Sequence, residues 1–151
     1  MTAANLSGSY SIEKVVDGNG YFKVTGINFI PGRTLNPCDD LTIELKYESS
    51  RDYKNLEMET VFYRDTSPFE CYLQETNLGQ NQELNIAKGA GKLTVTFRHV
   101  PVNNGNIKVA LTLWNEGRSE MLFWWRGINI NFNKAKKSTG EIHIPVIFKT
   151  Q

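Results

Sequence analysis

Two glutamates, Glu57 and Glu59, have the residue type and spacing that could most directly do chemistry. Residues two apart on a β-strand point to the same face, so their carboxylates would lie close together. Glycosidases cleave sugars with two carboxylates about 5–9.5 Å apart, one of them a proton donor. Such pairs are also common on solvated strand faces, which is the favoured interpretation here. A small glycan hydrolase is therefore the less favoured alternative, and we expect no catalytic residue.

Motifs for nucleotide, acyl-transfer and metal chemistry do not occur in the sequence. It has no GxxxxGK[ST] loop, no GxGxxG motif between a strand and a helix, and no GxSxG elbow. The histidines are His99 and His143, and the cysteines, Cys38 and Cys71, form no CxxC pair. These residues do not make a zinc ligand set of the usual spacing, so we expect no metal and no cofactor in this domain. The thiols are expected to be reduced, because no secretory signal is visible.

The elements that must position these residues are strands, because apolar and polar residues alternate along most of the chain. The clearest cases are 41–47, 92–98 and 108–114. Further strands are expected at 10–16, 21–29, 56–63, 69–75, 120–126, 128–132 and 141–148. Turn residues separate them, with a hairpin expected at 17–20 and a turn at 88–91. Many short strands and no long helix predict an all-β antiparallel sandwich or jelly roll.

Strand parity turns several aromatic and polar side chains outward. The strand at 108–114 presents Thr112 and Trp114 opposite its apolar face, and the strand at 92–98 presents Thr96 and Arg98. The strand at 120–126 separates Met121, Phe123 and Trp125 from Leu122, Trp124 and Arg126. A bulge at Gly117 or Gly127 would exchange these two faces, so the choice between Trp124 and Trp125 stays open.

A sheet face with tryptophan, arginine and threonine is suited to sugars. Indole rings stack on the C–H surface of a sugar, and guanidinium groups bind carboxylates or pairs of hydroxyls. The candidate ligand-binding residues are Trp114, Trp124, Arg98, Arg126, Thr96, Thr112, Tyr63, Arg64 and Asn115. The alternative is that these aromatic residues only fill the core or a subunit interface.

Size and charge bound the function further. The chain has 151 residues, which is the common size of one domain, expected over 9–151 after a flexible lead-in at 1–8. Its 17 basic and 16 acidic residues give a net charge of +1, so no long-range field would collect nucleic acid or anionic lipid. The longest apolar run, Met121–Trp125, is far shorter than the roughly 20 residues that cross a bilayer as a helix.

Four segments resemble the C-terminal carbohydrate-binding domain of Wzt, the ATP-binding subunit of ABC transporters that export O-antigen polysaccharide in Gram-negative bacteria. They are 26–29, 41–47, the aromatic strand ending at 123–126, and 140–148. The resemblance extends over about 10–148. It implies an immunoglobulin-like β-sandwich that binds the non-reducing, capped end of the finished glycan and so licenses export.

The resemblance also implies partners and a location. The domain would form a homodimer in which the last strand, here 141–148, is exchanged. It would act in the cytoplasm at the inner membrane, beside the transporter's ATPase domain and its membrane subunit, without inserting into the bilayer. The several arginines favour an anionic cap such as Kdo. A dimerisation module without glycan binding is the main alternative.

Overall fold

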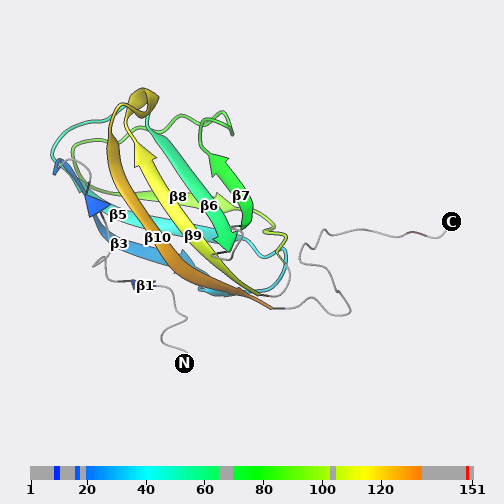
Figure 1. Ribbon diagram of the computed structural model, residues 1–151. Helices are drawn as coiled ribbons and strands as arrows, with labels where there is room; N and C mark the ends of the chain where they lie inside the picture. The colour runs from blue at the N-terminus through cyan, green and yellow to red at the C-terminus, as the bar shows by residue number, and fades with distance from the viewer. Residues whose placement is uncertain are drawn as a thin grey trace.

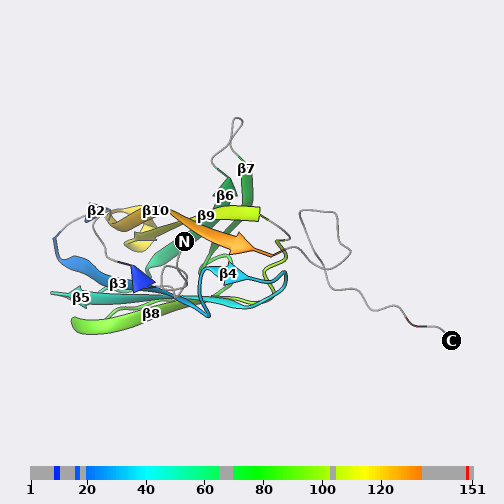
Figure 2. The same cartoon turned by 90° about the horizontal axis from the view of Figure 1, so that it is seen from below.

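The chain is an all-β sandwich of two packed sheets (Figures 1 and 2). The computed structural model describes residues 9–10, 16–17, 20–64, 70–102, 105–133 and 149. Among these residues no helix is long and apolar enough to cross a membrane. The expected lead-in at 1–8 and the last strand at 141–148, with its exchange between protomers, lie outside the described residues.

The first layer is a four-stranded antiparallel sheet. Its order is β1 (Ser9–Tyr10), β3 (Phe22–Ile30), β5 (Leu41–Ser49) and β8 (Gly89–Phe97). The β8 strand is the edge of this layer, and β5 is its only partner in the described sheet.

The second layer has six strands and carries the aromatic residues. Its main order is β2 (Val16–Asp17), β10 (Met121–Phe132), β9 (Gly105–Trp114), β6 (Glu57–Arg64) and β7 (Glu70–Thr76). The short strand β4 (Thr34–Leu35) pairs parallel with the end of β10, whereas the other pairs are antiparallel. The expected all-antiparallel arrangement therefore has one parallel exception.

The core lies between the layers and follows the alternation in the sequence. Leu41, Ile43 and Leu45 of β5 and Leu111 and Leu113 of β9 are fully buried. Figure 2 shows the two layers edge-on, so these strands turn one face of each sheet toward the other. At roughly 25 cal/mol per Å² of apolar surface removed from water, this interlayer contact is the main source of stability.

Two turns predicted from local sequence do not occur in the structure as expected. The hairpin expected at 17–20 is wrong, because β2 pairs with β10 while β3 pairs with β1 and β5, in the other sheet. The turn expected at 88–91 is wrong over Gly89–Gly91, which are the first residues of β8. There the small residues accommodate the side chain of Tyr47, because a Cβ on Gly91 would overlap with its ring.

The strands expected at 120–126 and 128–132 are one continuous strand, β10. Its pairing with β9 is irregular between Met121 and Phe123 and between Arg126 and Ile128. The first irregularity buries both Leu122 and Phe123, so the expected outward position of Leu122 is wrong. A bulge inserts a residue that strict alternation does not anticipate.

Candidate functional site

The outer surface of the six-stranded sheet holds the strongest candidate site. We call it the aromatic face and define it by Glu57, Glu59, Thr112, Trp114, Arg118, Trp124 and Arg126. Backbone pairing places Trp114 beside Glu57, and Thr112 between Glu59 on β6 and Trp124 on β10. Because neighbouring strands are about 4.8 Å apart, these residues lie within reach of one another.

The structure decides between the two adjacent tryptophans. Trp125 is 6% exposed and packs between the layers against Phe29, with ring centroids 6.3 Å apart. Trp124 is half-buried on the outer side, where the guanidinium of Arg126 lies 5.2 Å from its ring centroid. Trp124 and the exposed Arg126 therefore lie on the outer side, and Trp125 is a core residue.

A short 3₁₀ turn places a second arginine over the face. The turn η2 (Glu116–Arg118) joins β9 to β10, and the Asn115 side chain accepts a hydrogen bond of 2.9 Å from the Glu116 backbone N–H. Gly117 and Arg118 both have positive φ, which reverses the chain tightly. Arg118 is thereby returned over Trp114, with its guanidinium 5.6 Å from the ring centroid.

Arg118 is held by both glutamates. Its Nη2 lies 2.7 Å from Glu57 Oε1 and 3.0 Å from Glu59 Oε2, and its Nε lies 3.2 Å from Glu57 Oε2. Gln74 Nε2 donates a further bond of 3.1 Å to Glu59 Oε2. The glutamate side chains are only 13% and 16% exposed, so water screens this cluster weakly. Their expected common face is confirmed.

The electrostatics of the cluster favour the ionised form of Glu57. Hydrogen bonds from Arg118 lower the pKa of Glu57, outweighing the opposing effect of burial. The hydrogen bonds that Arg118 donates, to Glu57 first and to Glu59 second, raise the pKa of Arg118. A glycosidase needs one carboxyl group that keeps its proton near neutral pH, which requires a raised pKa. The cluster is therefore better suited to accepting hydrogen bonds from a ligand than to donating a proton.

One atom on the face lacks a partner. The indole N–H of Trp114 is buried and has no hydrogen-bond acceptor among the described residues. Buried donors without an acceptor are few in native proteins, and each calls for a reason such as a functional role.

The structure does not bring all the predicted residues together. Thr96 on β8 and Arg98 directly after it are both exposed, as expected, but β8 belongs to the four-stranded sheet. They therefore lie on the opposite side of the sandwich from Trp114 and Trp124, and the expectation of one shared face is wrong for them. Thr96 Oγ1 instead lies 2.9 Å from Thr42 Oγ1 on the neighbouring strand.

The remaining predicted residues lie at the margins of the aromatic face. Asn115 caps the turn that carries Arg118, so the structure gives it a positioning role. Tyr63 is 5% exposed and pairs with Lys108 of β9. Arg64 ends β6 and lies close to Gly105, where a Cβ would come within 2.9 Å of its Nη2. Arg118 was not predicted; the turn-forming residues Asn115 and Gly117, directly after Trp114, are the sequence signal that could have found it.

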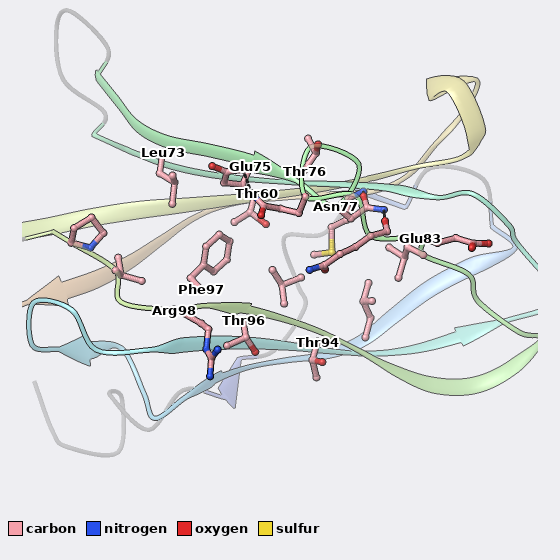
Figure 3. Close-up of a pocket in the computed structure, with 18 residues that line it drawn as sticks. Thr60, Leu73, Glu75, Thr76, Asn77, Glu83, Thr94, Thr96, Phe97 and Arg98 are labelled. Carbon is pink, nitrogen blue, oxygen red and sulfur yellow. Dashed lines mark hydrogen bonds between the residues drawn. The ribbon is translucent and has the colours of Figure 1, made fainter. Parts of the chain in front are cut away.

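A cleft of about 530 Å³ opens where the edges of β7 and β8 leave the sandwich unclosed (Figure 3). Figure 3 shows Phe97 and Leu73 in the space between the layers, whereas Arg98 points away from it. Phe97 is fixed there by an edge-to-face contact with Phe62, at 4.9 Å. The lining includes the core residues Met58 and Leu93 together with the buried Thr60 and several exposed polar side chains.

No group of metal-ligating side chains occurs in the described part of the chain. Cys38 and Cys71 are both free thiols, and burial raises the pKa of Cys38, with a smaller contribution from the charge of Asp39.

Comparison with known proteins supports the fold. No protein-family model and no curated protein matches the sequence. Among solved structures, the chain is similar to one described as the crystal structure of the C-terminal domain of wzt. The TM-score is 0.71 at 13% identity, and the match covers 95% of this chain and 92% of that chain. The chain thus has the fold of a Wzt C-terminal domain, which agrees with the resemblance seen in its sequence.

Proposed function

We propose that this chain is a non-catalytic carbohydrate-binding module for the non-reducing, capped end of an O-antigen polysaccharide. The observation that carries the proposal is the aromatic face, where Trp114 and Trp124 lie beside two carboxylates and two arginines. Indole rings supply stacking surface, and the charged groups supply hydrogen-bond donors and acceptors for hydroxyls. The shared fold supports the same role, because Wzt is the family that the sequence resembles.

In this proposal the module licenses export of the finished glycan by an ABC transporter. It acts as a homodimer in the cytoplasm, at the inner membrane, beside the ATPase domain and the membrane subunit. The capped end alone distinguishes a finished chain from a growing one, so binding must depend on the terminal residue. Moderate affinity is expected, because ordering a flexible glycan offsets part of the stacking and hydrogen-bond energy.

Calorimetric titration with capped and uncapped O-antigen fragments tests the proposal. Capped fragments should bind and uncapped ones should not, and the binding should disappear in Trp124→Ala. Equal binding to both would contradict recognition of the terminal residue. Light scattering on Trp124→Ala separates a binding face from an interface. If the variant no longer dimerises and the wild type binds no glycan, the aromatic face is a subunit contact.

A further inference from the structure

We infer that the aromatic face binds an uncharged sugar, which stacks on Trp124, passes over Thr112, and bonds through its hydroxyls to Glu59 and Arg118. This inference rests on the proposed function and names the ligand class for the same site. It departs from the anionic cap expected from the number of arginines in the sequence.

The charge of the face argues against an anion. Two carboxylates and Arg118 give the Trp114 end a net charge of −1, and Arg126 brings the whole face to zero. Arg98 was one of the arginines behind the expected anionic cap, but it directly follows β8 of the four-stranded sheet. Arg118 already shares its positive charge between Glu57 and Glu59. An anion beside it would be repelled by two carboxylates that are mostly buried and poorly screened.

The free hydrogen-bonding atoms match hydroxyl groups. In the described part of the chain, Glu59 Oε1 accepts no hydrogen bond and Arg118 Nη1 donates none, whereas their neighbouring atoms are all engaged. A hydroxyl both donates and accepts, so it can donate to Glu59 while accepting from Arg118. A phosphate dianion or a carboxylate only accepts, and it would leave the carboxylate facing another anion.

The backbone register sets the size of the ligand. Trp124, Thr112 and Glu59 lie in one row across β10, β9 and β6. Two strand spacings separate Trp124 from Glu59, about 10 Å between their Cα atoms. Thr112 is short and 8% exposed, so it forms the floor of this row. One pyranose ring stacked on Trp124 can therefore extend its hydroxyls over Thr112 to the far carboxylate.

Paired probes test the inference on the full chain. Neutral methyl glycosides of glucose, galactose and mannose are titrated by NMR, beside glucuronic acid, galacturonic acid and mannose 6-phosphate. At least one neutral glycoside should bind about 10-fold or more tightly than its anionic counterpart. Glu59→Gln should weaken that binding by about 10-fold or more, since it removes a charged acceptor. The matched control Glu44→Gln, at a similarly buried glutamate that pairs with Lys92 on the four-stranded sheet, should change it by less than about 3-fold.

Two results would overturn the inference in different ways. Tighter binding of the anionic probes, lost in Arg126→Gln and strengthened in Glu59→Gln, would show an anionic ligand and leave the proposed function intact. Binding of neither class at about 50 mM, roughly five times a Kd of 10 mM, would contradict the inference. Binding of the capped fragments in the calorimetric titration would then still support the proposed function, and its absence would contradict that function as well. Unfolding curves for each variant show whether a loss of binding reflects a loss of structure.

Discussion

The adjacent residues Trp124 and Trp125 should respond to the same substitution in opposite ways. Trp125→Ala removes an indole that is 6% exposed and packed against Phe29 between the layers. Truncation of a core tryptophan costs about 3–5 kcal/mol in the free energy of unfolding. For a domain of about 150 residues this lowers Tm by roughly 6–20 °C.

Trp124→Ala removes an outward ring whose described ring contact is with Arg126. An exposed cation–π contact contributes about 0.5–1 kcal/mol, so Tm should fall by no more than roughly 4 °C. Loss of a central binding tryptophan costs about 2 kcal/mol or more, which is about 30-fold in Kd. Glycan binding should therefore be lost in Trp124→Ala and kept within about 3-fold in folded Trp125→Ala.

Thermal unfolding followed by circular dichroism, together with titration calorimetry at 10 °C, measures both quantities on each variant. Equal destabilisation by the two substitutions would refute the assigned parity of β10. Loss of binding in folded Trp125→Ala with binding retained in Trp124→Ala would refute the aromatic face as the glycan site.

Three further changes test other parts of the structure. Because the pKa of Glu57 is lowered in the folded state, its stabilising effect is present above the ordinary carboxyl pKa and is lost as the pH falls through the folded value. Glu57→Gln should therefore lower the urea midpoint at pH 6 and approach the wild type at pH 3; a gap that stays constant would contradict this. Gly91→Ala should cost about 1–3 kcal/mol in urea unfolding because its Cβ would overlap with Tyr47, whereas the control Gly26→Ala, with an ordinary contact of 3.7 Å, should cost less. Asn115→Ala removes the cap of η2 and should cost about 0.5–2 kcal/mol, measured by urea unfolding, and weaken glycan binding; unchanged binding would show that the turn does not position the site.

Much of the fold could be predicted from local patterns. Alternation identified β5 and β9, with Leu111 and Leu113 inward and Thr112 outward, because side chains on a strand alternate between faces whatever the strand pairs with. The same rule placed Glu57 and Glu59 on one face. It failed at Leu122, where a bulge adds a residue to one strand and shifts the parity locally.

The composition of the site was less predictable. Arg118 was missed because its position depends on the positive φ angles of a tight turn and on the two carboxylates that attract it from another strand. Arg98 was placed with the tryptophans because its outward direction was correct. It follows β8, and the sheet of β8 depended on pairing with β5, which is distant in the sequence.

By itself, the sequence determined most of the strands, the buried faces of regular strands such as β5 and β9, and the chemical character of the candidate outward residues. These properties depend on alternation over a few residues and on side-chain type. The tertiary structure alone decided which outward faces belong to the same sheet. It thereby separated Arg98 from Trp114, buried Trp125 rather than Trp124, and returned Arg118 to Glu57 and Glu59. The physical reason is that strand pairing is a long-range choice, made by packing two layers around one core, and no local periodicity encodes it.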